Sequence, residues 1–470
     1  MELVKLLLAL SLPLVLGATC ISLLTRSGTA GRAAAVAGNG MLFGLILLPL
    51  LMRLLDGFGV GLRFHVIVFF AAGLIVVLVA ANSLKRRGPT PVAIPEPALT
   101  AMHRLLIGLF LVLLGLRLLS VGLELVWRPL FPWDATMHWA TKARVWFDAG
   151  GLVPFVEESQ WLRLGGEGVY TDHHPGYPVT IPLLQLWLSL ALDRWDESLM
   201  NLPWLLCCAG LAIAFYGQAR AAGSTALSAL IFTYMLVSMP LIGSHVALAG
   251  YADLFLGACY CAALMAFHNW SLRRETGQAL QALLFALCCP LIKNEGFFWA
   301  LTFIPALVVV LLPLRWALYV LYGTFVAVVL ALVLIPPDFT IAGHALDELR
   351  LFYRPGALAG VLASFWVQDN WHLLGYLLLA LLPISILSGS FGRGAYGGIT
   401  TALLAAVLLF LSLFLFTRYS LGALRFTSVG RISLHLVPGL MFYCLLLWNG
   451  VSARAGLGRD PDTMPAVGAQ

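Results

Sequence analysis

The sequence predicts an all-α polytopic membrane protein with about thirteen transmembrane helices and one large outer loop that carries juxtamembrane helices. Composition is the first reason: of the 470 residues, 61% are hydrophobic and 11% charged, and the mean hydropathy is +0.93. Such a composition excludes an ordinary soluble globular protein. The second reason is that apolar runs of about 20 residues recur along the whole chain. They are continuous rather than alternating, which excludes a transmembrane β-barrel.

The apolar runs predict the membrane helices in chain order. The first run could be mistaken for a signal peptide, but its cleavage region fits poorly and we expect it to stay as a helix. The first three helices end in KRRGPTPVAIPEP, so residues 1–100 are predicted to be an N-terminal addition to a main module at 101–452. Residues 453–470 are predicted to be a disordered cytoplasmic tail. The predicted spans are 3–24, 36–55, 65–84, 105–125, 199–219, 224–243, 253–270, 278–292, 297–313, 316–335, 373–389, 398–417 and 433–452.

The positions of the cations predict which loops face the cytoplasm. The apolar segment 179–192 is too short to span a bilayer comfortably, and we read it as a juxtamembrane or half-inserted helix. If it did span, Arg220 and the Arg273–Arg274 pair would face outward, against the positive-inside rule. Residues 126–198 are therefore predicted to form one outer loop, with further outer loops at about 336–372 and 418–431. Cations predicted on the outer side are candidates for binding an anion: Arg350, Arg354, Arg418, Arg425 and Arg431.

The eight cysteines all lie in or beside apolar runs. We interpret them as small hydrophobic side chains rather than as disulfides or metal ligands. They are Cys20, Cys207, Cys208, Cys259, Cys261, Cys288, Cys289 and Cys444.

A polar island at residues 130–178 interrupts the apolar sequence and is the first place to look for function. Its first part reads LFPWDATMHWATKARVWFDAGG. On a helix, Asp134, His138 and Lys142 are four apart and share one face, while Trp139 and Trp146 suit a membrane interface. The segment is predicted to be an amphipathic helix on the membrane. Asp is also a favoured N-cap, so Asp134 has a structural alternative.

The second part of the island, YTDHHPGYP, gathers Asp172, His173, His174 and Tyr177. An Asp beside two His residues could hold a metal ion. Adjacent histidines rarely ligate one ion together and no third ligand is evident, so a lining that contacts sugar or phosphate is favoured.

Two later segments add ionisable groups at predicted outer helix ends. Asp253 follows GYA at the start of one helix, and Lys293 and Glu295 interrupt the apolar run CCPLIKNEGFFW. Arg431 and His435 are four residues apart at the start of the last helix. Lys293 and Arg431 could bind a lipid phosphate. Each group also has a structural alternative. Asp253 could cap its helix or pair with a nearby Arg, Lys293 and Glu295 could neutralise each other, and Arg431 could extend its charged end to the membrane surface.

Several of these stretches occur in an order that resembles the GT-C glycosyltransferase superfamily. The stretches resemble in particular the bacterial relatives of protein O-mannosyltransferases and lipid A aminoarabinose transferases, and the resemblance covers roughly residues 100–452. The first three helices lie outside it. The stretches are WDATMHWATKARVWF, HHPGYPVTIPLLQLW, GYADLFLGACYCAALMAF, LIKNEGFFW and GRISLHLVP.

The resemblance implies transfer of a sugar from a polyprenyl-phosphate donor to an acceptor on the outer face of a bacterial plasma membrane. Asp134 matches the catalytic carboxylate of the first outer loop, and Asp253 matches a second acidic position. HHPGYP resembles the family's His-Pro-Pro element with Gly176 in place of the second Pro. Lys293 stands where the family often has Lys-Gly-Pro, which implies a donor-phosphate role.

The expected function is thus an inverting glycosyltransferase with Asp134 as general base. Asp253 is the second catalytic candidate. The substrate-binding candidates are His138, Lys142, His173, His174, Tyr177, Lys293, Glu295, Arg431 and His435. No residue is assigned as a metal ligand, although a divalent cation could still be a cofactor. The acceptor could be a lipid, glycan or protein, and no nucleic-acid partner is expected. A flippase for lipid-linked saccharides and a non-catalytic assembly partner are the alternatives.

Overall fold

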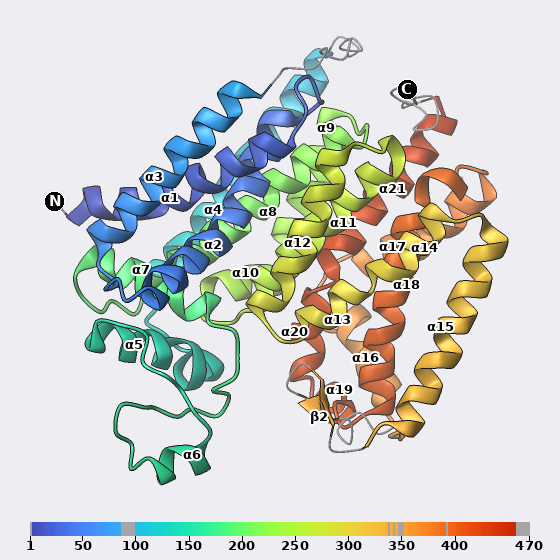
Figure 1. Cartoon of the computed structure of the whole chain (residues 1–470). Helices are drawn as coiled ribbons and strands as arrows, with labels where there is room; N and C mark the ends of the chain where they lie inside the picture. The colour runs from blue at the N-terminus through green and yellow to red at the C-terminus, as the bar shows by residue number, and fades with distance from the viewer. Residues whose placement is uncertain are drawn as a thin grey trace.

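Helices make up nearly all the regular structure in the computed structural model of the chain (Figure 1). It describes residues 2–85, 99–336, 339–341, 344–345, 352–391 and 393–456. The predicted domain boundary after Lys85, Arg350 and most of the predicted tail lie outside the described residues. A two-residue antiparallel pair, β1 (Thr340–Ile341) and β2 (His344–Ala345), is the only sheet in the described part.

The helices follow one another with short connections. In chain order they are α1 (Glu2–Leu24), α2 (Arg32–Gly57), α3 (Phe64–Leu84), α4 (Ala101–Trp127), the π-helix η1 (Ala135–Trp139), α5 (Ala140–Ala149), α6 (Glu158–Arg163), α7 (Thr180–Leu192), the 3₁₀ turn η2 (Leu199–Asn201), α8 (Leu202–Ala221), α9 (Ala226–Ser238), α10 (Pro240–Ala247), α11 (Asp253–Arg273), α12 (Thr276–Ile292), α13 (Gly296–Leu301), α14 (Phe303–Leu311), α15 (Leu314–Leu334), α16 (Ala357–Trp366), α17 (Leu374–Leu387), α18 (Arg393–Phe416), α19 (Ser420–Leu424), α20 (Ser428–Leu434) and α21 (Val437–Arg454).

All thirteen predicted apolar segments are helical. Six of the described helices are long and apolar enough to cross a membrane, and the number reaches eight if each of two bent pairs is one span. The chain is therefore an α-helical, multi-pass membrane protein. The bent pairs differ from the continuous helices predicted: α9 and α10 meet at 60°, and α20 and α21 at 51°. Proline lies in the first turn of α10 and of α21, and because it lacks an N–H it starts a helix more readily than it continues one.

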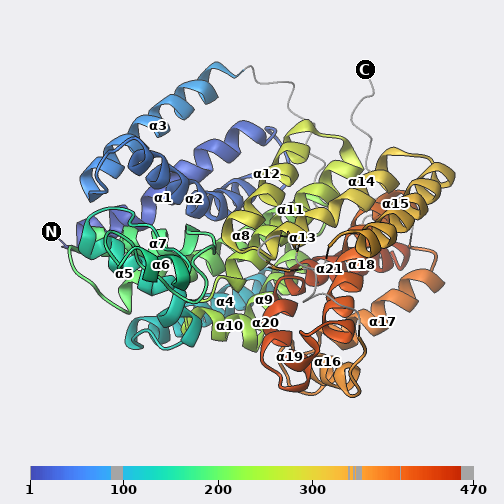
Figure 2. The ribbon, with the colours of Figure 1, turned by 60° about the horizontal axis from the view of Figure 1, so that its bottom comes forward.

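The distribution of exposed apolar side chains fits a lipid environment. Helix α11 lies at the centre and is buried over nearly its whole length, in contact with α8, α12, α18 and α21 (Figure 2). By contrast, α4 and α15 expose large apolar side chains along their length, among them Leu105 and Phe325. Exposed apolar area of this extent is costly in water and favourable in lipid.

The N-terminal helices pack into this bundle rather than standing apart from it. Helix α2 lies against α8, where a Cβ added to Gly38 would come within 2.0 Å of the Ala214 backbone. Helix α7 is almost wholly buried, and its Trp187 indole N–H donates to Ala9 O of α1 at 2.9 Å. The short predicted helix at 179–192 is thus confirmed and is enclosed by protein.

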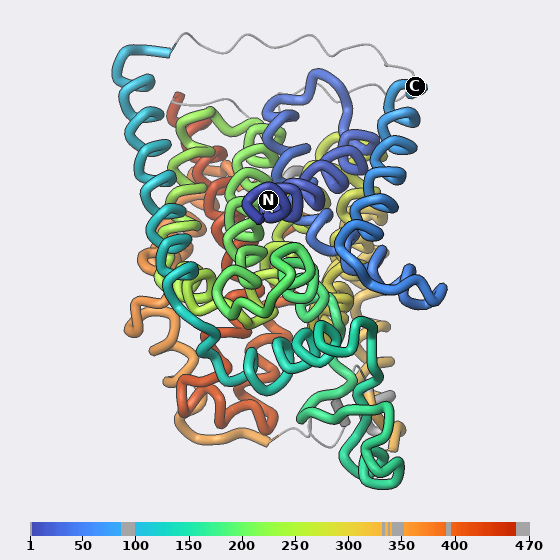
Figure 3. The backbone as a smooth tube through the Cα atoms, turned by 90° about the vertical axis from the view of Figure 1, so that its left-hand side faces the viewer, coloured from blue at the N-terminus to red at the C-terminus, as the bar shows by residue number. Residues whose placement is uncertain are grey.

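The loops gather at two ends of the bundle (Figure 3). Residues 130–178, with α5 and α6, lie at the lower end in the figure, and the end of α3 lies at the upper end. Contacts at that upper end join Lys85 to Leu23 O, Arg274 to Val310 O and Arg454 to Gly389 O. Lys85, Arg274 and Arg454 therefore lie near helix ends on the side of the bundle opposite the polar island.

Candidate functional site

A fully buried carboxylate, Asp253, is the centre of the candidate site. It lies in the first turn of α11, where the helix dipole favours an acid. Its Oδ1 is 3.0 Å from Lys293 Nζ and 2.9 Å from His435 Nε2, and its Oδ2 is 3.0 Å from Arg431 Nη2. Lys293 Nζ is also 3.0 Å from Glu295 Oε1. A carboxylate in this position is stable only because so many donors surround it.

Arg431 joins this buried centre to the polar island. Its Nη2 is 2.6 Å from Asp134 Oδ2, so one guanidinium contacts both predicted catalytic acids. The side chains of Arg431 and Asp134 are 26% and 23% exposed, whereas Asp253 is sealed off. The guanidinium also lies 4.1 Å from the centre of the Tyr251 ring. Asp134 is therefore the accessible acid, and Arg431 couples it to Asp253.

Two glycines allow the segments that carry these groups to meet. Gly250 has φ +124°, and an added Cβ would lie 2.2 Å from Ala135 Cβ, next to Asp134. Gly257 lies one turn after Asp253 on α11, and its Cβ would come within 2.7 Å of Leu434 O. Any larger residue at either place would push the polar island or the α20–α21 break away from Asp253.

Asp134 does not act as an N-cap. It adopts helical backbone angles, makes no side-chain capping bond, and uses its carboxylate to bind Arg431. The residues that follow form a π-helix, in which five-residue hydrogen bonds widen the turn. The even four-residue spacing predicted for the Asp134, His138 and Lys142 face is therefore disturbed, and Lys142 is paired with a different acid. Single π-turns are frequent at functional sites.

The hydrogen bonds of His435 fix its tautomer. The indole N–H of Trp299 donates to His435 Nδ1 at 3.0 Å, and an indole nitrogen can only donate. Nδ1 must therefore accept, which leaves the proton on Nε2, where it is donated to Asp253. His435 thus supports Asp253 as a hydrogen-bond donor, and Trp299 holds it in that form.

A second buried ion pair anchors the polar island. Lys142 Nζ is 3.1 Å from Asp172 Oδ2 with both side chains 1% exposed, and it donates to His174 O at 2.9 Å. Burial lowers the pKa of Lys142, and the neighbouring Asp172 opposes that shift. Asp172 Oδ1 also accepts the backbone N–H of His174 at 2.8 Å. Lys142 and Asp172 therefore hold the HHPGYP turn against α5.

Histidine and tyrosine rings cover this pair and extend toward the first centre. His138 lies 4.7 Å from His174, ring centre to ring centre, and Tyr177 stacks on His174 at 4.6 Å. His173 lies 6.0 Å from His138. Burial raises the pKa of Tyr177 to about 12, with a further contribution from the charge of Glu295. Tyr177 therefore links the two groups of polar residues.

The membrane-facing role predicted for the tryptophans of the island is wrong. Trp139 and Trp146 are buried, Trp139 against the Tyr177 ring at 5.4 Å and Trp146 with its N–H on Val153 O at 2.8 Å. The reason is that α7 packs on α5 and covers the helix face that was predicted to contact the membrane interface.

The histidines make the island sensitive to acid. Burial lowers the pKa of His138 and of His174 below the ordinary 6.5. The unfolded chain then takes up protons at a higher pH than the folded island, so stability is constant above about pH 6.5 and decreases below it. We expect a lower melting temperature at pH 5.5 than at pH 7.5, measured by intrinsic fluorescence in detergent. The His138→Phe, His174→Phe double variant should lose part of this decrease, and an unchanged decrease would contradict the assignment.

Among the described residues, no group of three or more His, Cys, Asp or Glu side chains is arranged to hold a metal ion. The eight cysteines are free, and seven of them are buried. Sequence reasoning assigned no role to Trp299 or Tyr251, although both lie inside the quoted stretches. An aromatic residue within a few positions of each buried charge was the signal available.

Comparison with protein-family models, curated proteins and solved structures finds no match to this chain.

Proposed function

We propose that the chain is an integral-membrane glycosyltransferase that moves a sugar from a polyprenyl-phosphate donor to an acceptor. The observation that carries the proposal is the bridge from exposed Asp134 through Arg431 to buried Asp253. It supplies an accessible base, a cation that can meet phosphate, and a buried acid that holds this cation in place. The order of sequence stretches shared with the GT-C superfamily supports the same reading.

The ion pairs suggest the sequence of steps. Three carboxylates (Asp134, Asp253 and Glu295) face two cations (Lys293 and Arg431), so no cation is in excess. A donor phosphate would take the exposed edge of Arg431 in place of Asp134. The freed Asp134 carboxylate would then accept the proton of the acceptor hydroxyl as its oxygen attacks the anomeric carbon. The bond from that carbon to the phosphate oxygen breaks, Arg431 stabilises the departing phosphate, and the configuration inverts.

A path for the lipid tail begins beside this centre. Phe297, Leu301 and Ile304 are exposed on one side of α13 and α14, starting two residues after Glu295. Their spacing of four and three places them in one stripe along the bundle surface. A polyprenyl chain lying on this stripe would bring its phosphate to Lys293 and Arg431.

The orientation in the membrane completes the proposal. We propose thirteen spans with residues 126–198 on the outer, periplasmic side of a bacterial plasma membrane. The position of Lys85, Arg274 and Arg454 near helix ends on the opposite side of the bundle supports this orientation. Sugars carried on lipid would then be available at the outer face.

One observation favours the flippase as a second candidate. The two bent helix pairs, α9–α10 and α20–α21, lie beside the candidate site, with α10 in contact with α20. Discontinuous helices at a substrate site are typical of transporters.

Reconstitution separates the two functions. The purified chain is placed in liposomes with polyprenyl-phosphate sugar and a hydroxyl-bearing acceptor such as a monoacylglycerol. Free polyprenyl phosphate and sugar-bearing product are both measured. A transferase forms the two products in equal amounts without other proteins, which would also exclude the non-catalytic partner. Movement of intact donor between leaflets with no cleavage would overturn the proposal in favour of the flippase.

A further inference from the structure

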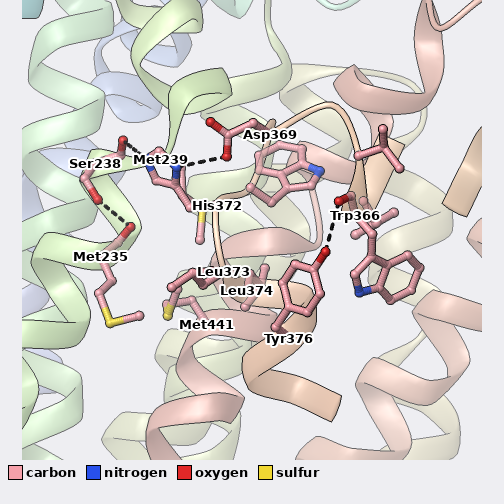
Figure 4. Close-up of a pocket in the computed structure, with 13 residues that line it drawn as sticks. Met235, Ser238, Met239, Trp366, Asp369, His372, Leu373, Leu374, Tyr376 and Met441 are labelled. Atoms are coloured by element: carbon pink, nitrogen blue, oxygen red, sulfur yellow. Dashed lines mark hydrogen bonds and ion pairs between the residues drawn. The ribbon is translucent and has the colours of Figure 1, made fainter. Parts of the chain in front are cut away.

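A cavity separate from the acidic centre opens between three parts of the fold. It has a volume of about 500 Å³ and is walled by the end of α9, by residues 365–376 and by α21 (Figure 4). This volume is within the usual range for small-molecule binding sites.

One end of the cavity is polar and carries no excess positive charge. His372 donates through Nε2 to Ser238 O at 3.1 Å, and its Nδ1 is 3.2 Å from Asp369 Oδ1 (Figure 4). Among the described residues that line the cavity there is no lysine or arginine. An anionic head group would therefore meet a carboxylate without a spare cation, which disfavours phosphate.

The backbone is held in an unusual form to produce this polar end. Asp369 and His372 have φ +52° and +47°, in the left-handed region that residues other than glycine seldom adopt. Backbone strain of this kind is retained where the surrounding structure enforces it, often at ligand sites.

The other end of the cavity is apolar. Met235, Met441 and Leu374 lie together there, away from Asp369 (Figure 4). Methionine side chains adapt to irregular apolar ligands. A cavity with one polar and one methionine-lined end suits an amphiphile.

Two tryptophans that line the cavity each have an indole N–H without a hydrogen-bond acceptor in the described part of the chain. The indole nitrogens of Trp366 and Trp371 are buried and find no hydrogen-bond acceptor among the described residues. Trp371 is fully buried. Because both nitrogens are closed off from solvent, and that of Trp366 lies beside Gly375, they do not face the cavity. The exposed carboxylate of Asp369 is therefore the group that can accept a hydrogen bond from a ligand hydroxyl.

We propose that this cavity binds an uncharged amphiphile with a hydroxyl-bearing head, and that this molecule is the sugar acceptor. The acceptor role rests on the glycosyltransferase proposal, whereas the binding site does not. The cavity wall reaches the candidate site: Asn370 O accepts the Leu241 N–H of α10 at 3.3 Å, and Asn370 Nδ2 lies 3.8 Å from the Cβ position of Gly430, the neighbour of Arg431.

Photolabelling of the full-length protein in liposomes tests the site. The probes are a diazirine-bearing monoacylglycerol and the lysophosphatidic acid with the same acyl chain. We expect saturable labelling of peptides containing 235–239, 365–376 or 441 by the monoacylglycerol, and about tenfold weaker labelling by the anionic probe. Asp369→Asn should narrow that difference, since Asn tolerates the left-handed backbone.

Matched variants decide the outcome. Val367 is exposed at the cavity, and Val367→Trp should reduce labelling about tenfold. Leu362→Trp, on an exposed position of α16 outside the cavity, should leave labelling and the melting temperature unchanged. Equal labelling by both probes, or full labelling of Val367→Trp, would overturn the proposal. If the amphiphile labels the cavity but no sugar is transferred to it, the binding site is confirmed and only the role of the amphiphile as sugar acceptor is rejected.

Discussion

Replacement of Asp134 by Asn should abolish most sugar transfer while leaving the protein folded. A general base contributes about 10²–10⁴-fold to a rate, so we expect a decrease of that size in turnover with saturating donor. Asn keeps the size of the side chain, and because the Asp134–Arg431 pair is partly exposed, stability should change by less than about 1 kcal/mol. Release of polyprenyl phosphate by reconstituted protein is the measurement.

Asp148→Asn is the matched control for this experiment. Asp148 lies on α5 of the same segment, exposed and paired with Arg144 at 2.8 Å, away from the buried centre. It should retain full turnover. Full turnover in a correctly folded Asp134→Asn protein would contradict the assignment of Asp134 as the base.

Replacement of Asp253 by Asn should instead destabilise the protein. Asp253 is the common partner of Lys293, Arg431 and His435 and is the fully buried acid of this centre. Its loss leaves Lys293 and Arg431 with only the partly exposed carboxylates of Glu295 and Asp134. Breaking a buried ion pair in this way costs about 3–5 kcal/mol. The decrease is measured as the free energy of unfolding in mixed micelles, followed by tryptophan fluorescence.

Two further variants show whether buried charge is the cause. Adding Lys293→Met to Asp253→Asn removes the buried cation that has lost its fully buried partner, while the carboxylate of Glu295 stays partly exposed to solvent, so the added change should recover at least about 1 kcal/mol. Glu124→Gln breaks an exposed pair with Arg128 and should cost less than about 1 kcal/mol. A loss in Asp253→Asn as small as the loss in Glu124→Gln would show that the acidic centre is not what holds these segments together.

Apolar run length predicted the helices well because a helix follows from local sequence. All thirteen segments are helical, and the short length of 179–192 correctly indicated the separate helix α7. The breaks after Ser238 and Leu434 were missed, although Pro240 and Pro438 lie just beyond them. The length of an apolar run does not show that a proline within it ends one helix and starts the next.

The sequence predicted which charged residues lie in the candidate site but not which acid pairs with which cation. Asp134, Asp253, Lys293 and Arg431 were each selected as charges in an apolar sequence, and ion pairs join them. Which acid pairs with which cation depends on contacts between segments more than 100 residues apart, such as Gly250 against Ala135. No local pattern contains that information. The burial of Trp146 by α7 was missed for the same reason.

The most direct test of the central claim is a cryo-EM map of the protein with a bound polyprenyl-phosphate sugar or its polyprenyl-phosphate product. The proposal predicts the phosphate at the exposed edge of Arg431, with the Asp134 carboxylate released from the guanidinium and facing the sugar. A phosphate bound at the opposite end of the bundle, with the Asp134–Arg431 pair intact, would contradict it.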